Sequence, residues 1–346
     1  MPDLRRVGAS PRPLPRTAPS TKPHLWTRPL EGSAVTITGE KLATALEPGS
    51  AAWLQTVSAS QIATILGISP WQSAHTLWHL KKGTRPAEPQ TNAQTRGHEF
   101  EPLIAEWFAA AHPEWQVCVT GTWRHRARHW QTATPDWVLI PDAGELMPEQ
   151  EPTALLEIKT AQDLVAWGDE VPNYYRAQAM WQADTIGVDR VIFAACGPFE
   201  LFDRRPKEFV VDYDPREAAL LREAALEFMD LLDLGVEPDP DYRRDDDRLT
   251  ARYKHPAVVD DSLDVPDEVA VPWLEALAAQ KAVDGDKSAA AAELAAYVGD
   301  SKTVVWRGIT LGSRRRGRGD QPPTFAAAKG IADKAIQLLD TMKESA

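Results

Sequence analysis

The stretch TATPDWVLIPDAGELMPEQEPTALLEIKT, residues 132–160, contains two runs that are typical of β-strands. Apolar and β-branched residues dominate TATPDWVLI (132–140) and TALLEIKT (153–160). The letters PDAGE between the two runs are a turn signal. This pattern predicts two neighbouring strands that pair as a hairpin, and the rest of the chain is interpreted around this pair.

Two carboxylates and a lysine fall at matching positions of these strands. Side chains two residues apart in a strand share a face, so Glu157 and Lys159 point one way and Ile158 the other. If the strands pair, Asp136 lies beside Glu157. Paired carboxylates suit a hard cation such as Mg²⁺, and a lysine beside them stabilises charge on a phosphate. The pattern favours metal-assisted hydrolysis of a phosphodiester; a surface hairpin with a Glu–Lys pair is the alternative.

Helical segments on either side carry further polar residues. RGHEFEPLIAEWFAAAHP (96–113) predicts a helix with Glu101 in its first turn, where a carboxylate also suits the positive end of the helix dipole. VPNYYRAQAMWQADTIGV (171–188) predicts an amphipathic helix. Its Gln178 and Gln182 lie one turn apart, either as part of a site or as an ordinary polar face.

The order of elements favours an α/β fold. Short helices precede a run of strands that includes QVCVTGTWRH (116–125), and a helix, two strands and a long helix follow. This order indicates a mixed β-sheet core flanked by helices, plus a helical C-terminal region. The predicted regions are a flexible basic tail at 1–35, the core at 36–235, an acidic linker at 236–268 and a helical extension at 269–346, with its last helix at about 323–343.

Composition excludes several classes of protein. The chain has 346 residues, a net charge of −12 and two cysteines. The acidic balance argues against a protein that grips nucleic acid with its whole surface, although local basic patches remain, such as RRRGR at 314–318. Two cysteines exclude a disulfide framework, and no apolar run is long enough to cross a membrane. We expect a cytoplasmic protein, within the host cell if a phage encodes it, with no membrane partner.

Five short motifs in a fixed order narrow the function. They are VSASQIATILGISPW, RGHEFEP, ATPDW, LLEIKT and YYRAQ, within about residues 50–235. Together they resemble the YqaJ-like viral recombinase family, also called the lambda exonuclease family, of the PD-(D/E)xK nuclease superfamily. The resemblance implies a restriction-endonuclease-like core and a Mg²⁺-dependent deoxyribonuclease, with Mn²⁺ as a substitute. It also implies 5′ to 3′ digestion of linear duplex DNA, which leaves a 3′ strand for an annealing protein in recombination.

The resemblance implies a role for each residue of the carboxylate–lysine group. Asp136 and Glu157 are expected to ligate the metal ion, together with the backbone carbonyl of Ile158. Lys159 is the expected catalytic lysine. Glu101 resembles the helix glutamate that ligates the metal or orients its waters.

The following helix is expected to complete the site. Gln178 resembles the family's catalytic glutamine. The family often has a second glutamine two residues later, where this chain has Met180. Gln182 is the candidate replacement.

A further group is expected to bind the DNA end. Ser60 falls where the family places a serine near the 5′-phosphate, and a helix N-cap is its alternative role. The family's lambda member has an arginine a few residues earlier, but here no Lys or Arg occurs between Lys41 and Lys81. Arg96 is the candidate substitute for that arginine.

Two other functions stay open. One is an endonuclease or repair nuclease of the same superfamily, which would cut circular DNA. The other is a non-catalytic protein that binds DNA ends in recombination, against which the intact Asp136, Glu157 and Lys159 set argues. The family also includes ring-shaped homo-oligomers, so a ring is one expected state.

Overall fold

A computed structural model describes residues 36–47, 49–142, 151–254, 256–258, 260, 262–335 and 339. The chain divides into two compact units, Met1–Val258 and Val259–Ala346, called here the N-terminal and C-terminal units. The expected basic tail at 1–35 lies outside the described residues. In the described part of the chain, no helix combines the length and apolar character needed to span a membrane.

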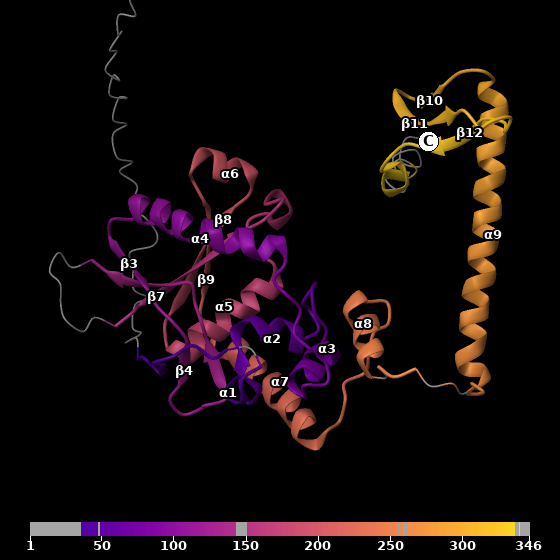
Figure 1. The fold of residues 1–346 in the computed structure, drawn as a ribbon. Helices are drawn as coiled ribbons and strands as arrows, with labels where there is room; N and C mark the ends of the chain where they lie inside the picture. The colour runs from indigo at the N-terminus through magenta and orange to yellow at the C-terminus, as the bar shows by residue number, and fades with distance from the viewer. Residues whose placement is uncertain are drawn as a thin grey trace, which may run out of the picture. The chain divides into compact units, whose positions relative to one another are not determined.

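A five-stranded mixed sheet lies at the centre of the N-terminal unit (Figure 1). Its strands, in the order β3-β6-β7-β8-β9, are Trp115–Val119, Trp137–Pro141, Ala154–Thr160, Arg190–Cys196 and Lys207–Asp212. All neighbouring pairs are antiparallel except β7 and β8, which are parallel. Parallel neighbours need a crossover connection, and helix α5 (Asn173–Ile186) provides it. The expected pairing between β6 and β7 is confirmed.

A second sheet of four short strands completes this unit. Its strands, in the order β1-β4-β5-β2, are Gly39–Lys41, Trp123–His125, Gln131–Ala133 and Val57–Ser58. The runs 116–125 and 132–140, each expected to be one strand, are both divided between the two sheets. Pro135 explains the second division, because proline has no N–H to donate to a sheet ladder. The division leaves Asp136 directly before β6.

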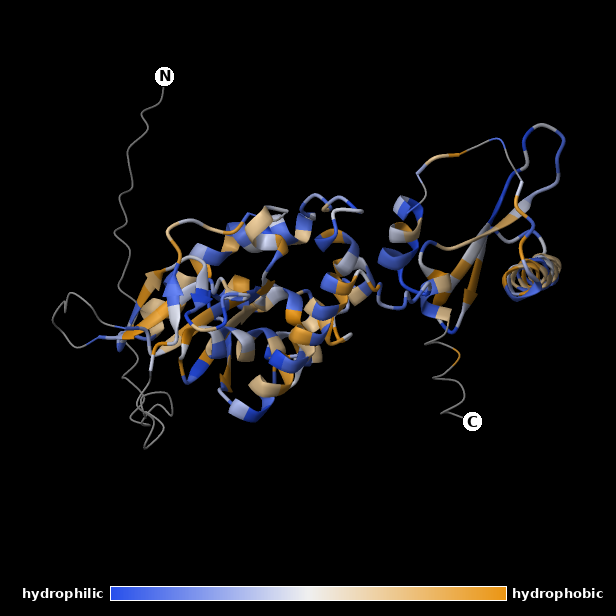
Figure 2. Cartoon of the chain, turned by 90° about the horizontal axis from the view of Figure 1, so that it is seen from below, coloured by the Kyte–Doolittle hydropathy of each residue, from blue (hydrophilic) through white to orange (hydrophobic). Residues whose placement is uncertain are grey.

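Helices cover both faces of the five-stranded sheet. Helix α5 packs on one face, and α7 (Pro215–Leu234) packs against α5 within the same core, which includes Leu155 and Trp181. Helix α4 (Asn92–Ala111) packs on the other face, against a cluster that includes Ile158. Figure 2 shows strands coloured mainly as apolar and helices with both polar and apolar sides. The expected mixed β-sheet core flanked by helices is confirmed.

Helix α4 begins at Asn92, earlier than expected. Thr91 is its N-cap, and the Thr91 backbone N–H donates to Gln94 in a capping box, which satisfies the first free N–H groups of the helix. Glu101 therefore lies in the middle of the helix, and its expected place in the first turn is wrong. The helix dipole does not account for a carboxylate at that position.

The other helices of the N-terminal unit are mostly short. They are α1 (Ala51–Leu54), α2 (Ala59–Ile65), α3 (Ala74–Lys81), the 3₁₀ helix η2 (Val165–Trp167), α6 (Pro198–Asp203) and α8 (Asp245–Lys254). Ser58 is the N-cap of α2, so Ser60 is not the cap. Helix α8 lies inside the range 236–268 that was expected to be a linker, and it packs against α3.

The C-terminal unit combines a long helix with a small sheet. Helix α9 (Asp267–Val298) confirms the expected helical region. The antiparallel sheet that follows contains β10 (Thr303–Trp306), β11 (Ile309–Arg315) and β12 (Thr324–Ala327). The expected helix from about 323 is wrong at its start, because β12 pairs with β11 there. A side chain in place of Gly312 would collide with Phe325 of β12, so glycine permits this pairing.

Candidate active site

Asp136 and Glu157 lie side by side at the start of β6. The register pairs Trp137 with Leu156, which places the preceding Asp136 next to Glu157 on β7. One carboxylate oxygen of Asp136 accepts a hydrogen bond from the backbone N–H of Ile158 at 2.7 Å. The contact between Asp136 and Ile158 thus uses the N–H of Ile158, and it fixes the Asp136 carboxylate against β7.

Glu157 is buried and held by three side-chain donors. Only 1% of the surface of Glu157 is exposed. Oxygen Oε1 accepts from Lys159 Nζ and from Gln178 Nε2, both at 2.5 Å. Oxygen Oε2 accepts from Gln182 Nε2 at 2.8 Å. Both oxygens are therefore held in one orientation, as a ligand or catalytic carboxylate requires.

Helix α5 supplies both glutamines from one face. Gln178 and Gln182 are four residues apart, so they lie above one another on a helix and both reach Glu157. Met180, where the family often has its second glutamine, points into the core and is 0% exposed. The structure thus brings Gln182, rather than residue 180, to the carboxylate.

Lys159 is held as an ammonium ion. Its Nζ lies 2.5 Å from Glu157 Oε1 and 5.2 Å from the ring centre of Tyr175. Burial opposes the charge, but the carboxylates of Glu157 and Asp136 raise the pKa of Lys159 above its ordinary value. A protonated lysine cannot act as a general base, so its chemistry here is positive charge and hydrogen-bond donation.

Negative charge is concentrated around Asp136. Burial and the neighbouring carboxylates of Glu157 and Glu101 raise the pKa of Asp136 well above its usual range, against the opposing effect of Lys159. A cation at this point would favour the ionised form of Asp136, so the donor set fits a metal ion that takes oxygen ligands. Among the described residues, however, Glu101 does not join Asp136 and Glu157 in a compact ligand group.

A small cavity adjoins the glutamine helix. Its volume is about 180 Å³, and Ser60, Trp53 and Gln178 contribute to its wall. The hydroxyl of Ser60 lies 3.1 Å from that of Ser58. Ser60 and Gln178 therefore line the same cavity. Arg96 is exposed on α4, and among the described residues it does not line this cavity.

Aromatic residues lie beside the site. Tyr175 precedes Gln178 by one helical turn, and its ring lies against the ammonium group of Lys159. Trp71 packs against Tyr174 and Tyr175 with centroid distances of 5.0 and 5.9 Å, and it is 63% exposed. Tyr175 and Gln178 are one helical turn apart, and this spacing in the sequence predicts that their side chains lie on the same face of the helix.

Part of the chain matches a known protein family. Residues 51–189 match the family model of the YqaJ-like viral recombinase domain. Among solved structures, an alkaline exonuclease from Laribacter hongkongensis is 20% identical, with a TM-score of 0.44 over 56% of this chain and 95% of the other. A phage-related exonuclease from Haemophilus somnus is 12% identical, with a TM-score of 0.39 over 52% and 95%. No curated protein matches the chain.

Proposed function

Because residues 51–189 form a YqaJ-like viral recombinase domain, we propose that this phage-type nuclease is a metal-dependent exonuclease acting on linear duplex DNA. It digests 5′ to 3′ and leaves a 3′ single strand for an annealing protein in recombination, in the host cell cytoplasm. The observation that supports this most strongly is the convergence of Asp136, Glu157 and Lys159 beside two glutamines. A ring-shaped homo-oligomer is part of the proposal.

Asp136 and Glu157 would hold the metal ion, with Mg²⁺ as the natural ion and Mn²⁺ as a substitute. Carboxylate oxygens are the preferred ligands of these ions, and the crowded negative charge at Asp136 favours a bound cation. The Ile158 carbonyl and Glu101 are proposed as further contributors. When bound, Mg²⁺ lowers the pKa of a water molecule and polarises a phosphoryl oxygen.

The chain's own residues position the substrate and stabilise charge. The Lys159 ammonium is aimed at the carboxylate pair, where it would donate to a phosphate oxygen as negative charge develops. Gln178 and Gln182 keep Glu157 in one orientation, and the Ile158 N–H does the same for Asp136. The burial of Glu157 excludes bulk water, which strengthens these electrostatic effects.

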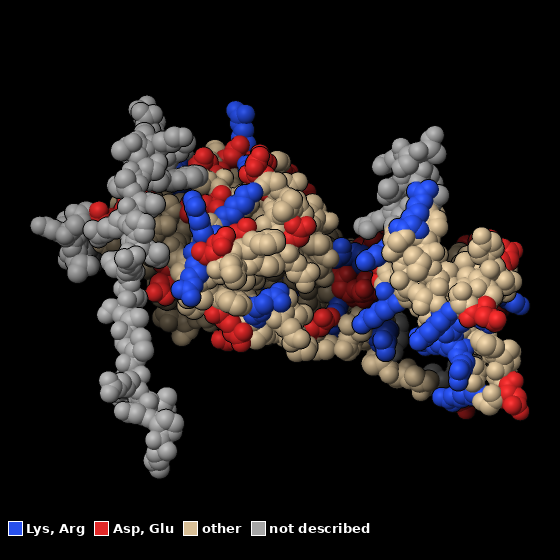
Figure 3. All heavy atoms as spheres, turned by 90° about the horizontal axis from the view of Figure 1, so that it is seen from above, with Lys and Arg blue, Asp and Glu red and all other residues tan. Residues whose placement is uncertain are grey.

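DNA contacts are proposed at two places. Ser60 would approach the 5′ end of the strand in the cavity that it shares with Gln178. Lys and Arg side chains gather over part of the C-terminal unit in Figure 3, and Arg314 and Arg315 of β11 belong to that unit. Basic side chains of this kind bind phosphates without reading sequence.

Linear and closed-circular duplex DNA would test the function. We expect loss of the linear form with Mg²⁺ or Mn²⁺, no loss with EDTA, and intact circles in every case. Strands labelled at the 5′ or the 3′ end would report the direction. Cleavage of circles would instead show an endonuclease, and binding to ends without cleavage would show a non-catalytic end-binding protein.

A 5′-phosphate is expected to change the initial rate of digestion by less than about 10-fold, the factor that 1.4 kcal/mol produces. The described residues that line the Ser60 cavity include no Lys or Arg to pair with the phosphate. Initial rates on 5′-phosphorylated and 5′-hydroxyl duplexes would measure this effect. A preference above 100-fold would indicate a cation elsewhere, and Arg96→Gln would then test the candidate from α4.

Gln182→Leu is expected to lower the digestion rate by about 10- to 100-fold, the usual effect of removing a side chain that orients a metal ligand. The change deletes the donor to Glu157 Oε2. It also deletes the amide oxygen of Gln182, which is buried without a hydrogen-bond partner among the described residues, so the fold should tolerate it. Met180→Leu, a volume-conserving change on the core side of the same helix, is the control and should stay within about 2-fold. Equal rates for both variants would show that Gln182 does not orient Glu157.

A further inference from the structure

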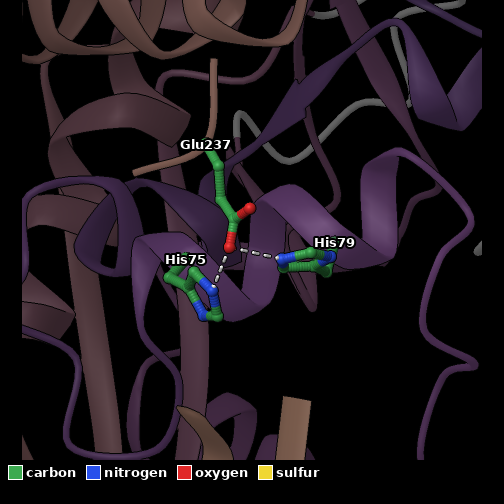
Figure 4. A group of neighbouring side chains, drawn as sticks. All are labelled: His75, His79 and Glu237. Atoms are coloured by element: carbon green, nitrogen blue, oxygen red, sulfur yellow. Dashed lines mark hydrogen bonds and ion pairs between the residues drawn. The ribbon is translucent and has the colours of Figure 1, made fainter. Parts of the chain in front are cut away.

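Two histidines and a glutamate meet at a place that the nuclease site does not use (Figure 4). His75 and His79 are one turn apart on α3 and therefore lie on the same face. Both are buried, with 1% and 4% of their surface exposed. Their Nε2 atoms lie 2.7 and 3.0 Å from a single oxygen, Oε1 of Glu237, which follows α7. Three potential ligand atoms thus converge from distant parts of the chain.

The other ring nitrogen of each histidine has its own partner. Nδ1 of His75 lies 3.2 Å from a carboxylate oxygen of Asp247, and Nδ1 of His79 lies 2.7 Å from the Thr84 hydroxyl. The same Asp247 oxygen also accepts hydrogen bonds from the hydroxyls of Ser73 and Thr76, so it acts as an acceptor toward the ring. The Thr84 hydroxyl donates to the backbone oxygen of His79, which leaves its lone pair to accept. Nδ1 of His75 is therefore the donor to Asp247, and the Thr84 hydroxyl offers a lone pair to which Nδ1 of His79 can donate.

This assignment decides the state of the two Nε2 atoms. A neutral imidazole carries one proton, so a protonated Nδ1 leaves a lone pair on Nε2. Both lone pairs then face Oε1 of Glu237, which is itself only an acceptor. With both Nδ1 atoms protonated, either one cation or two extra protons would satisfy the three facing atoms. Two buried imidazolium ions beside the Lys254 ammonium, which also contacts Glu237, would crowd three positive charges around one carboxylate.

We propose that His75, His79 and Glu237 bind one divalent transition-metal ion, with Zn²⁺ as the ion that suits them best. Two imidazoles and a carboxylate are a zinc ligand set, and water would take the fourth position. Hard Mg²⁺ prefers oxygen ligands, so this site is chemically distinct from the Asp136–Glu157 pair. The contacts of Asp247 and Thr84 with the rings are the outer-shell hydrogen bonds that orient metal-bound histidines.

The geometry needs little adjustment to accept the ion. Ligand atoms about 2.0–2.1 Å from a tetrahedral zinc ion stand about 3.3 Å apart. The two nitrogen–oxygen distances would therefore open by a few tenths of an ångström. Lys254 Nζ lies 2.8 and 2.9 Å from the two carboxylate oxygens of Glu237, and this ammonium partner favours the charged form of the carboxylate. The ion would join α3 to the segment between α7 and α8 and stabilise that part of the N-terminal unit.

Zinc content of the full-length chain tests the proposal. Protein without a histidine tag is stripped with a chelator, exposed to ZnCl₂ with excess Mg²⁺, and separated from free metal before elemental analysis. We expect one zinc per chain, a higher melting temperature with zinc, and visible absorption of tetrahedral Co²⁺ in its place. The Asp136→Asn variant should keep the zinc, which excludes the nuclease site as its source.

Variants locate the ion. Glu237→Gln keeps the shape of the side chain and should lower zinc affinity by at least about 100-fold, and Thr84→Val should lower it by about 10- to 100-fold. His112→Gln is the matched control, because His112 is also buried between two carboxylates, and no second histidine joins it within the part of the chain that the structure describes. Absence of zinc and of the Co²⁺ spectrum from the wild-type chain would overturn the proposal, as would zinc retained at full affinity in Glu237→Gln.

Discussion

Replacing Glu157 by glutamine is expected to slow the digestion of linear duplex DNA by about 100- to 1000-fold. The variant keeps the size of the side chain but loses the negative charge that pairs with Lys159 and would bind the metal ion. In the wild type, Gln178 and Gln182 each donate to a carboxylate oxygen of Glu157. In the variant one of these oxygens is replaced by an amide NH₂ group, which cannot accept a hydrogen bond. Initial rates at saturating Mg²⁺, together with circular dichroism of the folded protein, would measure the effect.

The control for this change is Glu208→Gln on β9 of the same sheet. Glu208 pairs with His112 and not with the carboxylate–lysine group, so its rate should stay within about 2-fold. DNA binding should survive in both variants, because neither change removes a basic side chain that is proposed to contact a phosphate. A Glu157→Gln protein that digests DNA within 10-fold of the wild type would remove Glu157 from the site.

Asp136→Asn is expected to abolish digestion and yet to stabilise the metal-free protein. Burial, Glu157 and Glu101 raise the pKa of Asp136, so its ionised form is unfavourable in the folded state. Asparagine removes that charge and can still accept from the Ile158 N–H through its amide oxygen. In EDTA at neutral pH we expect a melting temperature higher by at least about 2–4 °C, the shift that 1 kcal/mol produces in a domain of this size.

The pH dependence of the stabilisation by Asp136→Asn distinguishes an effect of charge from an effect of packing. Asp136 has a higher pKa in the folded state than the unfolded value of about 3.9, so the folded state binds the proton more tightly. The contribution of Asp136 to the free energy of unfolding is fully present below about pH 3.9 and is lost as the pH rises through the folded-state pKa. The gain of the asparagine variant in EDTA should therefore grow with pH over that window. A gain that is constant with pH, or a lower melting temperature, would contradict this assignment.

Local patterns in the sequence predicted the central sheet but not its interruptions. Alternation and apolar runs were enough to pair β6 with β7, because a strand shows its period in a few residues. The division at Pro135 depends on the missing N–H of proline, and that proline is visible in the sequence. The start of α4 was also visible, since Thr91 and Gln94 have the spacing of a capping box.

Contacts between distant segments account for what could not be predicted. The i, i+4 spacing placed Gln178 and Gln182 on one face, but only the packing of α5 on β7 shows that both reach Glu157. His75 and Glu237 are 162 residues apart, and no local pattern joins them. The position of Glu237 depends on α7 and α8, and α8 lies in a segment whose acidic composition resembled a linker.

The strand pair β6–β7 and helix α5 lie in one continuous stretch of the chain, which has a consequence for the order of folding. Asp136, Lys159 and Gln182 meet through a hairpin and the crossover that directly follows it. Loops that are short along the chain cost little entropy to close, so contacts of this kind form early. Amide hydrogens of β7 and α5 should therefore gain protection together during refolding, before the segments around His75 and Glu237 find each other.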